Sequence, residues 1–383
     1  MKLLQIIPTY KPAYIYGGTI TAISLLCETL VAKGGCQVTA LSTTANGKEE
    51  LPVHKHKPLL VDGVEVYYFP RWTKDHTQFS PALLIWLWRN VKKFDAVHIH
   101  SWWNISVLLS AWVCILRGVK PVLSPHGMLS PFTLTGKFKP YFHRFLGKKL
   151  LKNTLLHTTS EQETSECLAL IPEWEHINLP NFIDLDSLPF AKKKSLNGHA
   201  VHANDTIRLL FLSRLHQKKG IELLFEALAQ LPFKWSLTMA GDGESDYIEG
   251  LKKQSKDLHI DDKINWLGWV NAEKRLAAFE TADLLVLTSH NENFAIVVIE
   301  SLAVGTPVLV SKHVGLANYV SEKNLGWVCD TTTESIRDKL MEVHSQTAQR
   351  IEMAERSSNQ IRQDFDPSIL VQRYMNMYKN HGK

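Results

Sequence analysis

Two carboxylates in an apolar stretch are the residues of this sequence whose types and spacing most suggest chemistry. Glu292 and Glu300 stand eight residues apart, and Glu300 is the only other charged residue between Glu292 and Ser311. Burying a carboxylate without a partner is strongly unfavourable. We therefore expect Glu300 either to bind a ligand or to be satisfied by a neighbouring backbone group or arginine.

The elements around this pair predict where it lies. A strand at Asp283–Ser289 precedes a polar loop at His290–Asn293, and a helix at Phe294–Val304 follows. If helical geometry extends back to Glu292, Glu300 lies about 12 Å further along the axis. It then returns to within about 80° of the same face. Two acceptors so placed could reach the sugar and ribose ends of one nucleotide sugar.

Cations and glycines recur where other predicted strands end. Arg214 follows a strand in Ser213–Gly220, and Lys219 precedes Gly220 at the start of a helix. Two cations at a helix N-terminus suit a diphosphate. Glycine turns also occur at Tyr14–Gly18 and Gly241–Ser245. Each glycine turn alone indicates a tight turn more often than a ligand site.

Short β-rich runs alternate with amphipathic segments twice along the chain, which favours parallel sheets with helical crossovers. We expect two facing Rossmann-like, doubly wound α/β domains with ligands bound in a cleft between them. The first spans residues 1–190 and is joined by a C-terminal helix at about 365–383. The second spans 191–364, after a polar segment at Ala191–Thr206. The predicted strands are Leu3–Thr9, Gln37–Thr43, Val64–Pro70, Asp95–Ser101, Lys120–His126, Ile207–Ser213, Lys234–Gly241, Lys263–Trp269, Asp283–Ser289 and Thr306–Ser311.

Composition is that of a soluble globular protein, with 45% hydrophobic and 21% charged residues in 383. We expect no bilayer-spanning segment and no signal peptide. The five cysteines are scattered and form no CxxC pair, which favours a reducing cytoplasm over disulfides or metal binding.

Charge is distributed unevenly. Residues 1–152 hold 19 Lys and Arg against 7 Asp and Glu, whereas residues 153–190 hold 7 acids and no base. The first domain therefore carries most of the positive field, which suits a phosphate-bearing partner or an anionic membrane surface. Nucleic acid is not expected, because no RNA- or DNA-binding motif accompanies the charge.

Together these pieces resemble the retaining glycosyltransferases of family 4, which have the GT-B fold. The E-x7-E pair Glu292/Glu300 is the most specific part, and the Arg214–Lys219 segment matches the family's diphosphate motif. Pro180–Asp184 resembles the segment that closes its first domain. Ser124–Pro131, "SPHGMLSP", resembles a loop of bacterial polysaccharide-assembly members.

The resemblance implies a metal-independent hexosyl-transferring enzyme without a cofactor, using a UDP- or GDP-sugar as co-substrate. Arg214 and Lys219 would bind the donor diphosphate and stabilise it as a leaving group. Glu300 would hold the ribose hydroxyls. Glu292, with backbone amides that follow it, would hold the donor sugar and diphosphate. Those amides belong to Asn293 and Phe294.

Further residues are implied at the same donor site. Gly17 and Gly18 would let a first-domain loop close on the phosphates, and Gly241 would supply another turn. Trp269 would contact the nucleobase, and His126 the donor sugar near the reacting centre. From the residues alone, His126 could instead simply end a strand. Many members have glycine where Ala295 stands, and the extra methyl would narrow the space beside the sugar. The implied catalytic residues are His126, Arg214, Lys219 and Glu292.

Two patterns raise the question of a metal. Asp184 and Asp186 form a DxD triplet, but the cations already described supply positive charge. His98 and His100 alternate along a strand without an evident third ligand, so strand-end polar residues are the favoured interpretation.

The acceptor is implied to be a glycan or a polyprenyl-diphosphate-linked glycan. Gly136–Asn153 is basic and aromatic, and with Ile85–Lys93 it could form a face at the inner membrane surface, or simply a solvated basic helix. The alternatives to a transferase are a GT-B-like sugar-nucleotide epimerase and a non-catalytic nucleotide-sugar or glycan-binding protein.

Overall fold

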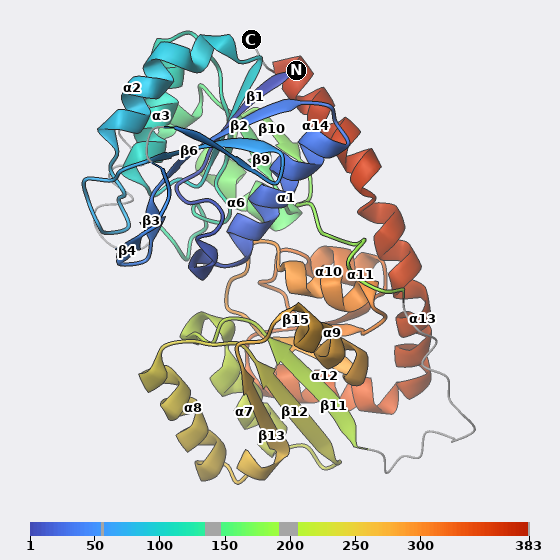
Figure 1. Ribbon diagram of the computed structural model, residues 1–383. Coiled ribbons are helices and arrows are strands. Elements are labelled where there is room, and N and C mark those ends of the chain that lie inside the picture. Colours follow the sequence, from blue (N-terminus) through green and yellow to red (C-terminus); the bar gives the residue numbers. More distant parts are fainter. Residues whose placement is uncertain (55–56, 135–146, 191–205, 382–383) are drawn as a thin grey trace. The chain divides into compact units, whose positions relative to one another are not determined.

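The computed structural model describes residues 1–54, 57–134, 147–190 and 206–381. The chain divides into two compact units, and each is described by itself (Figure 1). Unit 1 combines Met1–Ile183 with the segment from Phe365 onward, and unit 2 is Asp184–Asp364.

Unit 1 is built on a sheet with the strand order β10-β9-β8-β7-β1-β2-β6-β5. Neighbouring strands are parallel except β5 and β6, which are antiparallel. The strands are β1 Lys2–Ile6, β2 Gln37–Thr43, β5 Pro58–Val61, β6 Val64–Phe69, β7 Ala96–His100, β8 Val122–Ser124, β9 Leu155–Thr158 and β10 His176–Asn178; β3 Ala45–Asn46 and β4 Glu49–Glu50 pair separately. The helices are α1 Gly18–Ala32, α2 Pro81–Asn90, α3 Ile105–Leu116, α5 Lys148–Leu151, α6 Glu161–Leu170 and α14 Pro367–His381.

Both faces of this sheet are buried, because successive strand residues point to opposite sides. Leu3 packs into a core with residues of α1 and α14, whereas Leu4 packs into a second core with residues of α2 and α3. Val122 and Leu123 of β8 divide in the same way. Burial on both faces explains why these strands carry apolar residues at successive positions rather than alternating apolar and exposed polar residues.

Unit 2 has a second parallel sheet, with the order β13-β12-β11-β14-β15-β16. Its strands are β11 Ile207–Leu212, β12 Trp235–Ala240, β13 Ile264–Gly268, β14 Leu284–Leu287, β15 Val308–Ser311 and β16 Gly326–Cys329. Its helices are α7 Ile221–Ala229, α8 Ser245–Asp257, α9 Ala272–Thr281, α10 Ile296–Ala303, α11 Ala317–Glu322, α12 Thr333–Ser345 and α13 Thr347–Asp364. The expectation of two doubly wound α/β domains is thus confirmed.

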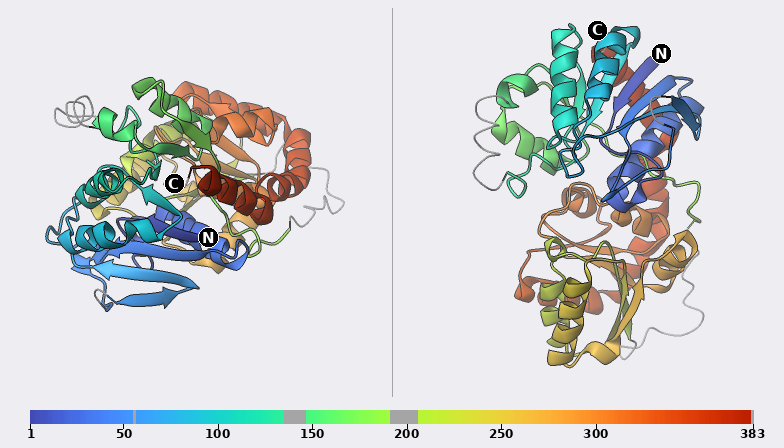
Figure 2. Two further views of the ribbon diagram at one scale, coloured as in Figure 1. Left: turned by 90° about the horizontal axis from the view of Figure 1, so that it is seen from above. Right: turned by 60° about the vertical axis from the view of Figure 1, so that its left-hand side comes forward.

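The last helix returns to unit 1. α14 begins at Pro367, where proline's missing N–H and fixed φ suit a first helical position. Its buried side chains Leu370, Tyr374 and Tyr378 join the core of β1 and α1. The red α14 lies beside the blue N-terminal elements in both views of Figure 2.

One predicted element was wrong in a way that matters for the site. The helix expected at Phe294–Val304 begins only at Ile296, because Ala295 has left-handed backbone angles (φ 62°). Glu292 therefore precedes the helix, and a separation computed from helical rise does not apply to the Glu292–Glu300 pair.

In the described parts of the chain, no helix is both long and apolar enough to cross a bilayer.

Candidate functional site

In unit 2, the loops that follow β11, β12, β13 and β14 leave the same edge of the sheet, because the strands are parallel. This carboxyl edge is where open α/β sheets bind ligands. It carries Arg214 and Lys219 after β11, Gly241 after β12, Trp269 after β13 and Glu292 after β14. Residues far apart in the sequence are thus brought to one edge.

The loop after β11 is fitted closely to the loop after β14. Gly220 has a left-handed φ of 63°, and a Cβ there would lie 2.4 Å from the carbonyl oxygen of Thr288. The Thr288 hydroxyl donates to the Gly220 carbonyl at 3.0 Å. Only glycine fits this position, which places the preceding Lys219 against the loop that carries Glu292.

Lys219 and Glu292 form an ion pair between these two loops. Their side chains are 14% and 24% exposed, so the pair is partly open to water. The backbone of Glu292 is held as well: its N–H donates to His313 O at 2.9 Å, and its carbonyl accepts from Gly315 N at 2.8 Å. Arg214, nearby on the same loop as Lys219, is exposed.

Glu300 lies inside α10 and is only 8% exposed. The Arg275 guanidinium of α9 lies 3.0 Å from its carboxylate. Burial raises the pKa of Glu300, against the lowering effect of Arg275 and with a smaller raising effect of Asp184. The alternative in which an arginine satisfies Glu300 therefore describes the structure. Ligand binding by Glu300 remains a prediction.

Two further predicted residues border this edge. Gly241 has φ 143°, and a Cβ there would lie 1.9 Å from Ser213 O, so the turn after β12 requires glycine. Its N–H donates to Gly268 O at 2.8 Å, which links it to the turn before Trp269. Trp269 is 74% exposed. A large exposed aromatic ring at the rim suits stacking on a planar group.

The segment before α10 is mostly buried. Phe294 is 3% exposed and Ala295 8%. Ala295 is an alanine in the left-handed region, where glycine is the unstrained choice. This accounts for the glycine that many resembling proteins carry here. Asn293 is partly buried and lies between Glu292 and Phe294.

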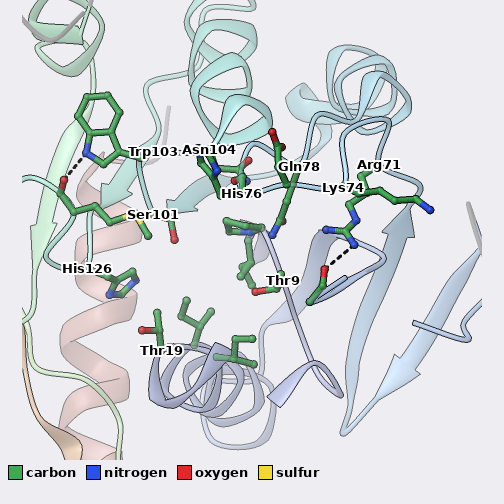
Figure 3. Close-up of a pocket in the computed structure, with 17 residues that line it drawn as sticks. Thr9, Thr19, Arg71, Lys74, His76, Gln78, Ser101, Trp103, Asn104 and His126 are labelled. Atoms are coloured by element: carbon green, nitrogen blue, oxygen red, sulfur yellow. Dashed lines mark hydrogen bonds between the residues drawn. The ribbon is translucent and has the colours of Figure 1, made fainter. Parts of the chain in front are cut away.

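Unit 1 has its own pocket at the carboxyl edge of its sheet, with a volume of about 450 Å³. His126 and Thr19 lie at one end, and Arg71 and Lys74 lie toward the other (Figure 3). The lining residues are Ile7, Pro8, Thr9, Thr19, Ile20, Ile23, Gly47, Arg71, Lys74, Asp75, His76, Gln78, Ser101, Trp103, Asn104, His126 and Met128.

The basic side chains of this pocket differ in whether they are exposed to a ligand. Arg71 is buried and already donates to Glu50 Oε1 at 2.7 Å and to the Gly47 carbonyl at 2.9 Å. Lys74 and His76 are exposed at the pocket. Asp75, between them in the sequence, is exposed at the pocket as well. Ile7, Ile20 and Ile23 supply an apolar wall, so the pocket combines an apolar side with a rim that carries both signs of charge.

His126 lines the pocket from the loop after β8. Its backbone is left-handed, with φ 52°, and the next N–H, of Gly127, donates to Glu163 Oε1 at 2.6 Å. His126 Nε2 lies 3.0 Å from His100 Nδ1. Burial, with a smaller effect of His157, lowers the pKa of His126 to about 3, so the ring is neutral near pH 7.

Gly17 and Gly18 stand at the start of α1, directly before the pocket residue Thr19. Gly17 has φ 82° and is the N-cap, and Gly18 is exposed as the first helical residue. A helix start without a side-chain cap leaves backbone N–H groups available to an anion.

The structure shows where the two possible metal-binding patterns, the His98/His100 pair and the Asp184–Asp186 triplet, lie. His98 and His100 do lie on one side of β7, with ring centroids 4.0 Å apart. Asp184 Oδ1 accepts a hydrogen bond from Ser187 N at 3.3 Å, as in a polar turn. In residues 1–54, 57–134, 147–190 and 206–381, no group of three or more His, Cys, Asp or Glu residues could hold a metal ion.

Sequence reasoning missed Arg275 and most of the unit 1 pocket. Arg275 precedes Glu300 by 25 residues and lies on another helix, so no spacing pattern connects them. The pocket residues come from six separate segments of the chain, so no local sequence pattern connects them.

Two family models match the chain. Residues 16–187 match the model described as Glycosyltransferase Family 4, and residues 194–364 match the model described as Glycosyl transferases group 1. An uncharacterized glycosyltransferase of Methanocaldococcus jannaschii is 25% identical, over 99% of this chain and 98% of its own. A D-inositol 3-phosphate glycosyltransferase of Pseudarthrobacter chlorophenolicus is 27% identical, over 62% and 59%.

Solved structures give the same picture of the fold. Sucrose-phosphate synthase from Thermosynechococcus elongatus has a TM-score of 0.74 at 18% identity, covering 99% of this chain and 98% of its own. Anabaena HepE in complex with UDP has a TM-score of 0.74 at 18% identity, covering 99% and 100%. Two Rossmann-like domains with these neighbours establish the GT-B fold.

Proposed function

We propose that this chain, a glycosyltransferase with the GT-B fold, is a retaining enzyme of the family 4 type. It moves a hexosyl group from a UDP- or GDP-sugar to a glycan or lipid-linked acceptor in surface polysaccharide biosynthesis. The UDP in the Anabaena structure supports a nucleotide-sugar donor. Unit 2 binds the donor, and the pocket of unit 1 takes the acceptor.

The observation that carries this proposal is the meeting of Lys219 and Glu292 at the carboxyl edge of the unit 2 sheet. A donor sugar nucleotide carries a diphosphate and several hydroxyl groups. Lys219 and the exposed Arg214 can bind the first, while Glu292 can accept hydrogen bonds from the second. The exposed Trp269 on a neighbouring loop suits the nucleobase.

The chemistry follows from where charge develops. The bond between the sugar's anomeric carbon and the diphosphate oxygen breaks, and its electron pair stays on the diphosphate. Arg214 and Lys219 stabilise that negative charge, which supports a metal-independent reaction. The acceptor hydroxyl attacks from the face that the leaving group vacates and passes its proton to a phosphate oxygen, so configuration is retained. In this mechanism neither glutamate forms a bond to the sugar: Glu292 accepts hydrogen bonds from its hydroxyl groups, and Glu300 lies buried beside Arg275.

The test is a thermal-shift screen of UDP- and GDP-sugars, because a ligand that binds only the folded state raises its apparent stability. One nucleotide series should stabilise the protein, and that donor should then be consumed in the presence of a glycan acceptor. Donor epimerised without acceptor would indicate an epimerase, and donor bound but intact would indicate a binding protein. Stabilisation by no nucleotide sugar would contradict the proposal.

We also propose peripheral binding to an anionic membrane through the outer face of α2 and α3, two helices that pack against each other (Figure 1). The exposed apolar side chains follow helical spacing: Ile85 and Trp88 on α2, and Ile105, Leu109, Trp112 and Leu116 on α3. Arg89, Lys92 and Lys93 adjoin them and are exposed. Of the predicted basic segment Gly136–Asn153, residues 136–146 lie outside the described residues.

Apolar insertion together with cations predicts binding that anionic lipid strengthens and salt weakens. Vesicles of phosphatidylglycerol should retain the protein, and high salt should release it. Trp112→Gln should weaken retention, whereas Trp72→Gln, which removes an exposed tryptophan elsewhere in unit 1, should not. Equal retention of both variants, or no binding at low salt, would end this part of the proposal.

A further inference from the structure

A continuous chain of hydrogen bonds runs through the core of unit 1 and ends at the pocket. It joins four histidines: two from β7, one from β9, and one from the loop that follows β8, the strand between them. Apart from His126, its members are at most 1% exposed. In order from the core to the pocket they are His157, Ser124, His98, Tyr378, Gln5, His100 and His126.

The donor and acceptor of each hydrogen bond in this series follow from the contacts of His157, at the end farthest from the pocket. His157 Nε2 lies 3.0 Å from the Leu179 carbonyl oxygen, which can only accept. The Tyr374 hydroxyl, 3.2 Å from the same nitrogen, donates its own proton to the Pro180 carbonyl, so it also accepts here and His157 carries its proton on Nε2. Its Nδ1 is then an acceptor, so the hydroxyl of Ser124 has to donate to it. In a neutral histidine, the hydrogen bond made by one ring nitrogen thus decides whether the other nitrogen donates or accepts.

The same logic passes through the next three groups. Because the Ser124 hydroxyl proton is committed to His157, its oxygen accepts from His98 Nε2 at 2.6 Å. His98 Nδ1 is then an acceptor, and the hydroxyl of Tyr378 donates to it at 2.8 Å. The Tyr378 oxygen in turn accepts from Gln5 Nε2 at 3.3 Å.

Gln5 connects Tyr378 to His100, the histidine beside His126. With its amide nitrogen on Tyr378, its Oε1 accepts from His100 Nε2 at 2.8 Å. His100 Nδ1 is left as an acceptor, so His126 Nε2 must donate to it. Burial lowers the pKa of all four histidines, to about 3 at His126 and about 4 at His157, so each ring carries one proton.

We propose that this relay holds His126 as the neutral Nε2–H tautomer and thereby presents its unprotonated Nδ1 as a hydrogen-bond acceptor at the unit 1 pocket. Tyr378, from α14, is a positioning residue. Its hydroxyl accepts from the Gln5 amide and keeps that amide oriented, which in turn fixes the tautomers of His100 and His126. Resting on the proposed function, the group that Nδ1 receives is a hydroxyl of the donor sugar or acceptor.

Nuclear magnetic resonance of the protein labelled with ¹⁵N-histidine tests the tautomer without any substrate. Two-bond correlations between ring protons and nitrogens distinguish the two neutral tautomers and the cation. At pH 7, His126, assigned by its loss in His126→Asn, should show a protonated Nε2 and an unprotonated Nδ1. The opposite tautomer or a charged ring would overturn the relay. Absence of glycosyl transfer would leave this result intact and would count only against the proposed function.

Tyr378→Phe tests the positioning role. Without the hydroxyl, the Gln5 amide can turn over and donate to His100, which reverses the proton positions on His100 and His126. A second His126 tautomer should then appear. Tyr10→Phe is the matched control, because Tyr10 is a fully buried tyrosine of the same core whose hydroxyl is outside the relay. A single unchanged His126 tautomer in Tyr378→Phe would remove Tyr378 from the proposal.

Discussion

The ion pair between Lys219 and Glu292 permits a quantitative test of the donor site. Lys219→Ala removes the cation, Glu292→Gln removes the anion, and the double variant removes both. If the two residues serve only each other, the double variant should cost little more than either single variant. If both also bind donor, their effects on turnover should accumulate.

The partial exposure of Lys219 and Glu292 sets how much stability the loss of either residue should cost. With side chains 14% and 24% exposed, the pair lies between a surface pair, worth about 0–1 kcal/mol, and a buried pair, where removing one partner costs about 3–5 kcal/mol. We expect each single variant to lower the free energy of unfolding by about 1–2 kcal/mol. Loss of a cation from the departing diphosphate should raise the reaction barrier by about 2.7–4 kcal/mol, which is roughly a 10²–10³-fold lower kcat.

The assay measures release of nucleoside diphosphate at saturating donor, alongside urea unfolding of each variant. Lys218→Ala is the matched control, because it removes the adjacent lysine of the same short helical turn. The reasoning would be refuted if Lys219→Ala stayed folded and kept its turnover within about threefold of the parent protein.

Three further results are expected. Gly220→Ala should lower the free energy of unfolding by about 2 kcal/mol or more in urea titration, since its Cβ would clash with Thr288 O, whereas Gly268→Ala, with φ 64° and open space, should cost only about 1 kcal/mol. Ala295→Gly should change the unfolding free energy by less than about 1 kcal/mol, whereas Ala295→Val should lose more, because β-branched residues strongly avoid left-handed angles; equal effects would contradict the strain. Acidification from pH 7 to 5 should lower the free energy of unfolding of unit 1 by about 2 kcal/mol through His157 alone, because the His157 ring gains a proton near pH 6.5 when unfolded, whereas its folded pKa is about 4. Hydrogen exchange of amides in β8 and β9 measures this loss. If His157→Gln left the dependence of the unfolding free energy on pH unchanged, the assignment to His157 would be refuted.

Strand positions were largely predictable because both faces of each large sheet are buried, so most strands carry apolar or β-branched residues at successive positions. Gln37–Thr43 was predicted to the residue. The strand expected at Lys120–His126 shortens to Val122–Ser124, since the flanking Pro121 and Pro125 have no N–H for the ladder. The short β16, Gly326–Cys329, was missed because four residues containing a glycine give too weak a pattern.

The candidate site was predictable in its parts but not in its pairings. Spacing and residue type indicated Lys219 and Glu292 separately, but their contact depends on the close fit of Gly220 to Thr288, which is a tertiary property. The helical-rise estimate of the Glu292–Glu300 separation does not apply, because a single left-handed residue, Ala295, starts the helix only at Ile296. Local propensity does not reveal such a residue when it is an alanine.

The return of the last helix to unit 1 has a consequence for biosynthesis. During translation, β1 to β10 leave the ribosome well before α14, yet Tyr374 and Tyr378 fill their core. Unit 2 can close its own hydrophobic centre first, and until α14 emerges the nascent N-terminal half has an exposed apolar surface that chaperones recognise. Truncation of the chain before α14 would therefore damage the part of the protein made earliest.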